Sequence, residues 1–195
     1  MSSTITALTS GGGIAVAGDT SGVLDLKSAN GTYTATLPQA TGTVMVSGNM
    51  PAFQAFVGTQ SISADTSTLM AFSNEVYDTA SCFNNTGSTV SGIPAYSFLP
   101  NVAGYYQVNL SCYWRSYPAT GFVGMTLFKN GSGYLEVTRI NTATGTFSGS
   151  CLVYLNGSTD YIGGYWYAAN NGGTVIADNN GASFSNFSAA LVRAA

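Results

Sequence analysis

The chain has 195 residues, of which 7% are charged and none is histidine, whereas an ordinary soluble domain carries roughly 25% charged residues. Without histidine, a histidine-based catalytic triad and a histidine-containing zinc site are both excluded. Five scattered Lys and Arg side chains also exclude a basic nucleic-acid-binding face. Because so few charges protect the surface, we expect much of it to be covered in an assembly.

No run of the sequence approaches the roughly 18 apolar residues of a membrane helix, so no membrane insertion is expected. The first residues lack the basic and apolar regions of a secretory signal, which favours synthesis in the cytoplasm. The three cysteines, Cys82, Cys112 and Cys151, are an odd number at wide spacing. They fit neither a disulfide framework nor a metal motif, so we expect free thiols.

Short strands are predicted in the first 50 residues, at 23–27, 32–37 and 43–46, with Asn30-Gly31 between the first two. Such a small β-meander cannot bury a core alone, so it needs another surface to lie on. Its large apolar residues are Leu24, Leu26, Tyr33, Leu37 and Val44. We place a boundary in the linker near residue 50, which divides the chain into segments 1–50 and 51–195.

Residues 51–195 show abundant strand patterns and almost no helix pattern. The clearest strand is 105–115, where alternate residues are apolar and predict one buried face. That face consists of Tyr106, Val108, Leu110, Cys112 and Trp114. Further strands are predicted at 122–129, 150–155, 160–168 and 184–192. Turns are predicted at 130–131, 156–157, 171–172 and 180–181, each with the Asn-Gly sequence of tight hairpins. This series predicts an all-β sandwich or barrel.

The acidic residues give little indication of chemistry. Glu75 and Asp78 are the closest pair in sequence, and a glycosidase needs two carboxylates about 5 to 9.5 Å apart, but solvated loop carboxylates are the favoured interpretation. Residues 178–181 (DNNG) are rich in oxygen but lack the spaced acids of a calcium loop, so they are predicted to form a turn. We therefore expect no enzymatic activity, no cofactor and no metal.

Six motifs in residues 51–195 resemble, in the correct order, the C1q domain of the C1q/TNF-like jelly rolls. They lie at 51–56 (PAFQAF), 83–87 (FNNTG), 98–108 (FLPNVAGYYQV), 127–131 (LFKNG), 149–155 with 160–162 (GSCLVYL, DYI) and 187–192 (FSAALV). The sequence departs from the family pattern at 156–159 and at Ala189-Ala190. The resemblance implies a ten-stranded C1q/TNF-like jelly-roll sandwich that assembles as a homotrimer.

A second resemblance concerns the N-terminal segment. Residues 22–27 (GVLDLK) and 33–44 (YTATLPQATGTV) are similar to an element frequent near the N-termini of tailed-bacteriophage fibre and virion proteins. This resemblance implies that residues 1–50 anchor the chain to a phage particle. The anchor contacts would then be the apolar residues named above, Leu24, Leu26, Tyr33, Leu37 and Val44.

The aromatic residues Trp114, Tyr165, Trp166 and Tyr167 leave three interpretations open. The three are core residues, the lining of a trimer axis, and an exposed shelf that stacks on sugar rings. In strand phase, Tyr165 and Tyr167 share one face and Trp166 takes the other. A core or a trimer interface is favoured over the glycan shelf.

The leading hypothesis is a structural phage virion protein: a homotrimeric capsid decoration (cement or head-fibre) protein on the virion surface, made in the cytoplasm of the host bacterium. Its partners would be itself and the major capsid or tail subunits. The alternative is a short tail fibre or tail-tip adhesin that binds host surface glycans. A depolymerase is disfavoured because a clear acid pair is missing.

Overall fold

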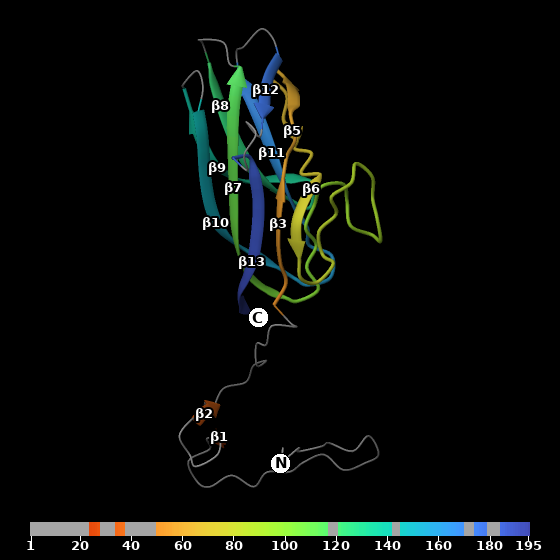
Figure 1. Ribbon diagram of the computed structural model, residues 1–195, viewed down its shortest axis with the longest axis vertical. Coiled ribbons are helices and arrows are strands. Elements are labelled where there is room, and N and C mark those ends of the chain that lie inside the picture. The colour runs from red at the N-terminus through yellow and green to blue at the C-terminus, as the bar shows by residue number, and fades with distance from the viewer. Residues whose placement is uncertain are drawn as a thin grey trace. The chain divides into compact units, whose positions relative to one another are not determined.

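The computed structural model describes residues 24–27, 34–37, 50–116, 121–141, 145–169, 174–178 and 184–195 (Figure 1). The chain divides into two units, Met1–Gly42 and Thr43–Ala195. In the first unit, β1 (Leu24–Lys27) and β2 (Thr34–Leu37) pair antiparallel, with Leu24 opposite Leu37. The third predicted strand of this region, 43–46, lies outside the described residues, and the boundary near residue 50 stays a prediction.

The second unit contains two antiparallel sheets. The larger comprises β3 (Ala52–Phe56), β4 (Gln60–Ser63), β6 (Asn74–Asp78), β7 (Gly104–Ser116), β10 (Gly145–Leu155), β12 (Thr174–Asp178) and β13 (Asn186–Ala194). The smaller comprises β5 (Thr68–Leu69), β8 (Phe122–Lys129), β9 (Ser132–Ile140) and β11 (Ile162–Ala169). Among the described residues, no helix is long and apolar enough to cross a membrane.

The order of the strands identifies the architecture. In the larger sheet β10, β7, β13, β3 and β6 lie side by side, and β12 with β4 extends the sheet along the far end of β7 (Figure 1). The smaller sheet has the order β5-β11-β8-β9. The chain passes repeatedly from one sheet to the other, since β7 and β10 belong to the larger and β8, β9 and β11 to the smaller. The unit is therefore an all-β jelly-roll sandwich, as the sequence predicted.

The core lies between the two sheets and follows the predicted alternation. The five residues of β7 from Tyr106 to Trp114 that were expected on one face are all buried. Val123, Met125 and Leu127 of β8 oppose them from the smaller sheet. The ring of Phe53 stacks on Phe83 at a centroid distance of 4.3 Å and meets Phe187 edge-on at 4.8 Å. Among the side chains whose burial the structure describes, no charged one is buried.

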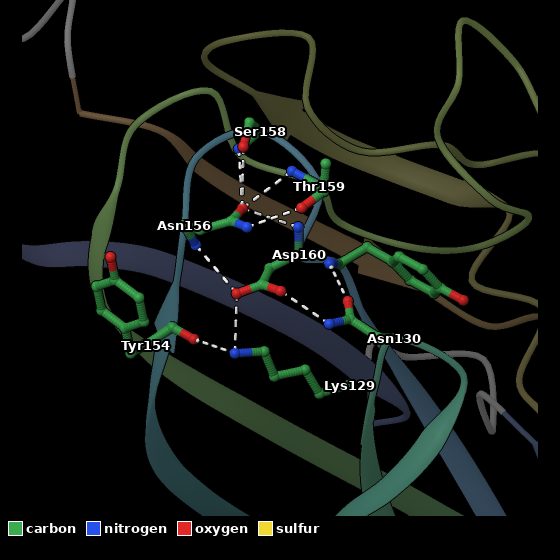
Figure 2. A network of polar contacts seen from close by, with 8 residues as sticks. Lys129, Asn130, Tyr154, Asn156, Ser158, Thr159 and Asp160 are labelled. Atoms are coloured by element: carbon green, nitrogen blue, oxygen red, sulfur yellow. Dashed lines mark hydrogen bonds and ion pairs between the residues drawn. The ribbon is translucent and has the colours of Figure 1, made fainter.

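A polar network closes one end of the sandwich (Figure 2). The carboxylate of Asp160 accepts hydrogen bonds from Lys129 Nζ at 2.9 Å, Asn130 Nδ2 at 2.7 Å and the Asn156 amide at 3.2 Å. Partial burial raises the pKa of Asp160. The hydrogen bonds from Asn130 and Lys129, with the charge of Lys129, outweigh that effect and hold the pKa below its usual value. The network joins the β8–β9 turn, where Asn130 and Gly131 have positive φ as predicted, to the turn after β10.

Candidate functional site

Part of one face of the larger sheet, formed by β3, β7, β10 and β13, carries no charged side chain. In β7 up to Trp114, in β10, in β3 and in residues 186–192 of β13, buried residues alternate with residues that point outward. We call the outward set the neutral face. Its members are Ala52, Gln54, Phe56, Tyr105, Gln107, Asn109, Ser111, Tyr113, Thr146, Ser148, Ser150, Leu152, Tyr154, Asn186, Ser188, Ala190 and Val192.

One end of the neutral face is apolar. Four of its large side chains, those of Tyr105, Leu152, Tyr154 and Val192, are between 40% and 61% exposed in the protomer. Tyr105 and Tyr154 are cross-strand partners whose rings meet edge-on at 5.5 Å. Exposed large apolar side chains grouped on one face are typical of interaction surfaces. Among the described residues, two charges border this end: Arg193, opposite Tyr105 at the β13 bulge, and Lys129, whose Nζ lies 5.9 Å from the centroid of the Tyr154 ring.

The other end of the neutral face holds a shallow groove of about 390 Å³. Amides and hydroxyls line it, together with Gly149 and part of Leu110: Asn109, Ser111, Ser148, Ser150 and Asn186. Ser111 is held in place because its hydroxyl donates to the Phe184 carbonyl and accepts from Asn186 Nδ2 at 2.7 Å. The neutral face thus combines an apolar end with a hydrogen-bonding end, a composition that protein interfaces share.

The predicted aromatic site separates into two locations. Trp114 and Trp166 are buried in the core, with ring centroids 5.3 Å apart. Their assignment to a trimer interface or a glycan shelf is therefore wrong, and the core alternative holds for both, because each points between the sheets in strand phase. The indole Nε1 of Trp166 has no hydrogen-bond partner among the described residues.

Tyr165 and Tyr167 are half-buried on the outward face of the smaller sheet. The ring of Tyr165 stacks on Phe128 at 3.7 Å, and Tyr167 lies 5.8 Å from Phe122. The guanidinium carbon of Arg139, which is paired with Glu136 on β9, lies over the Phe122 ring, 4.0 Å from its centroid. The two tyrosines are thus partly covered by their neighbours, and their role as an interface or a glycan shelf stays a prediction.

The role of the predicted anchor residues stays a prediction. Leu24 and Leu26 belong to β1 and Leu37 to β2, whereas Tyr33 and Val44 lie outside the described residues. The turns predicted at 171–172 and 180–181 also lie outside them.

The two carboxylates of β6 have different environments. Asp78 accepts hydrogen bonds from the Ala80 amide at 3.1 Å and the Phe83 amide at 2.7 Å, so it fixes the loop that follows β6. Glu75 is largely exposed. Its pKa is raised mainly because the carboxylate is partly desolvated, and secondly because the negative charge of Asp78 lies nearby. In the described ranges, no group of three or more His, Cys, Asp or Glu side chains is placed to hold a metal ion.

The neutral face was not predicted from the sequence, although a signal for it exists. In 150–155, Leu152 and Tyr154 are apolar residues on the face opposite to Cys151, Val153 and Leu155. A strand that is apolar on both faces has a second surface to cover.

No protein-family model and no curated protein matches the chain. Among solved structures, murine APRIL is 14% identical with a TM-score of 0.48, covering 73% of this chain and 99% of that chain. The globular domain of zebrafish complement 1qA protein is 14% identical with a TM-score of 0.48, covering 74% and 98%. The PRD1 vertex protein P5 is 17% identical with a TM-score of 0.45, covering 74% and 96%. At these identities and TM-scores, the fold assignment rests on the strand order described above.

Proposed function

We propose that the chain is a non-enzymatic structural protein of a tailed-phage particle, which assembles as a homotrimer and decorates the capsid. The neutral face is the observation that carries this proposal. It presents four large hydrophobic side chains, and covering them stabilises an assembly by roughly 25 cal/mol per Å² of buried apolar area. The residues of the face carry no charge, so burying its centre desolvates no ion; Arg193 and Lys129 lie at its border.

The sequence resemblances supply the rest of the proposal. In the trimer, the neutral face of each protomer lies against its neighbours. Residues 1–50 fasten the trimer to capsid subunits by strand addition, with Leu24, Leu26, Tyr33, Leu37 and Val44 as the contacts. The sandwich then projects from the virion surface.

Light scattering on the purified chain tests the trimer. We expect a mass near three times 20.0 kDa. The double variant Leu152→Arg/Val192→Arg should give a folded monomer. It should fold because both side chains are exposed in the protomer, and it should not assemble because burying two arginine charges in an interface has a large desolvation cost. Val90→Arg is the matched control, since Val90 is similarly exposed but lies in the loop after β6. A monomeric wild type, or a trimeric double variant, would contradict the proposal.

The alternative is a short tail fibre or tail-tip adhesin, and the outward aromatic residues of the smaller sheet favour it. Tyr165 and Tyr167, with their partners Phe128 and Phe122, offer ring faces of the kind that stack on sugars. Imaging of labelled protein on virions separates the two roles, because label on the capsid supports decoration and label on the tail supports the adhesin. Deletion of residues 1–48 should abolish incorporation in either case while the trimer still forms.

A further inference from the structure

The segment between β6 and β7, residues 79–103, is the longest irregular connection in the described part of the chain. Loops of more than about 12–15 residues without regular structure are commonly functional or disordered. Together with Asp78, which accepts hydrogen bonds from the Ala80 and Phe83 amides, the side chain of Asn84 holds this loop. Its Nδ2 donates to the carbonyls of Ser88, Ile93 and Pro94 at 2.7, 2.9 and 3.1 Å, and its Oδ1 accepts from the amide and hydroxyl of Thr86. The loop therefore has a fixed shape.

A cavity of about 290 Å³ lies between β6 and this loop. Ligand cavities range from about 300 to 1,000 Å³, so this one suits a ligand of about one ring. Part of its wall is apolar and comes from Phe83, Val90 and Ile93. A tight turn with positive φ at Ser91 (50°) and Gly92 (83°) sets Val90 against Ile93, which exchange backbone hydrogen bonds of 2.9 and 3.1 Å.

The polar lining falls into two sets. Asp78, Asn84 and Thr86 are engaged in the hydrogen bonds that hold the loop. The second set consists of Glu75, Ser81, Asn85 and Ser91, whose side chains make no hydrogen bond to any other residue that the structure describes. The cavity thus presents one carboxylate, one amide and two hydroxyls with unused bonding capacity, beside an apolar wall.

This combination discriminates between ligand classes. The lining includes two carboxylates and no cation, which disfavours an anion. A calcium ion takes six to eight oxygen ligands, whereas both oxygens of Asp78 already accept backbone amides. A pyranose ring matches the cavity, because its hydroxyls donate to a carboxylate and accept from an amide, while its C–H face contacts apolar side chains. We propose that this cavity, the Glu75 cavity, binds one hexopyranose ring.

In this site the Glu75 carboxylate accepts hydrogen bonds from adjacent ring hydroxyls, and the Asn85 amide donates to another. The apolar face of the ring lies on Val90 and Ile93. No residue of the neutral face takes part, so sugar binding is independent of the trimer and goes beyond a structural role on the particle. A failure of one proposal leaves the other standing.

Saturation-transfer NMR on the full chain, with a panel of methyl hexopyranosides at millimolar concentration, tests the site. The panel should include the gluco, galacto, manno and N-acetylglucosamine glycosides. We expect at least one to bind, and the dissociation constant can then be measured by calorimetry. Glu75→Gln and Asn85→Ala should each weaken binding about tenfold, which equals about 1.4 kcal/mol. Their melting temperatures should match wild type, because neither side chain holds the loop.

Glu136→Gln is the matched control, since it removes one carboxylate from β9, at the β10 edge of the sandwich and across it from β6 (Figure 1). It should leave the affinity unchanged. The proposal is overturned if no glycoside of the panel binds, or if binding survives both Glu75→Gln and Asn85→Ala. It is also overturned if calcium ions alone perturb the Glu75 resonances and no sugar does.

Discussion

Replacing Asp160 by asparagine should remove a substantial part of the stability of the sandwich. The Asp160 carboxylate is 14% exposed and accepts three hydrogen bonds, one of them from the Lys129 ammonium group, which is 22% exposed. An amide of the same shape has one acceptor oxygen. If the amide oxygen of the new asparagine keeps the hydrogen bonds from Lys129 and from the Asn156 backbone amide, its NH₂ group faces the NH₂ group of Asn130. Two donors cannot bond to each other, so one hydrogen bond is lost.

The magnitude follows from these contacts. A lost neutral hydrogen bond costs about 1 kcal/mol, and a bond from a cation weakens by about 1–2 kcal/mol when its partner becomes neutral. Asp160→Asn should therefore lower the free energy of unfolding by about 2–3 kcal/mol at pH 7. Urea unfolding followed by circular dichroism, at one fixed protein concentration because assembly adds to apparent stability, measures this difference.

Glu136→Gln is the control. The side chains of Glu136 and Arg139 are 40% and 52% exposed, and exposed ion pairs contribute about 0–1 kcal/mol, so this substitution should change the free energy of unfolding by no more than that.

The effect of pH has a definite sign. The pKa of Asp160 in the folded chain lies below its usual 3.8, so the carboxylate stabilises the fold above about pH 4, and this contribution is lost as the pH falls through the folded value. The difference between wild type and Asp160→Asn should thus shrink below about pH 4. Equal effects of the two substitutions at pH 7, or a difference independent of pH, would refute the reasoning.

Three further outcomes are expected. Among the described residues, Asn84→Ala removes the only side-chain donor to the Pro94 carbonyl and one of two donors to the carbonyls of Ser88 and Ile93. It should cost about 2–3 kcal/mol and open the loop to limited proteolysis, whereas Asn85→Ala should do neither. Gly149→Ala makes the new Cβ clash with the Val137 carbonyl, so the free energy of unfolding in urea should fall by at least about 1–3 kcal/mol. Gly58→Ala is the control, because a Cβ there meets nothing within 4 Å, and it should leave the free energy of unfolding unchanged. A thiol reagent monitored by mass spectrometry should modify Cys151 first, because Cys151 is half-buried whereas Cys82 and Cys112 are buried. Burial raises the pKa of all three thiols, so all should react slowly in the native protein; equal rates would contradict the burial pattern.

The sequence was informative where a strand has one buried and one exposed face. Alternation located β7, β8, β10, β11 and β13, and the Asn130-Gly131 turn was placed correctly. The strand β9 was missed because it lies at a sheet edge and most of its residues are exposed, so no apolar alternation marks it. The short strands β4, β5, β6 and β12 were missed for want of length.

The candidate sites were harder to predict than the fold. The alternation of side chains along a strand was enough to place Trp166 on one face and Tyr165 and Tyr167 on the other. Knowing which of these faces points into the core required the positions of the neighbouring strands. The Glu75 cavity had no signal in the sequence, because it depends on hydrogen bonds from Asn84 to carbonyls four to ten residues away. Backbone carbonyls are present at every position, so their use as acceptors cannot be inferred from residue types.

The contact between Trp114 and Trp166 makes the chain its own optical reporter. These are the two tryptophans of the sequence, and both lie in the core of the sandwich rather than on the neutral face or in the N-terminal segment. Tryptophan emission should therefore shift to the red when the sandwich unfolds and stay constant when intact protomers separate. A dilution series followed by fluorescence and by light scattering would then resolve dissociation from unfolding in a single unlabelled sample.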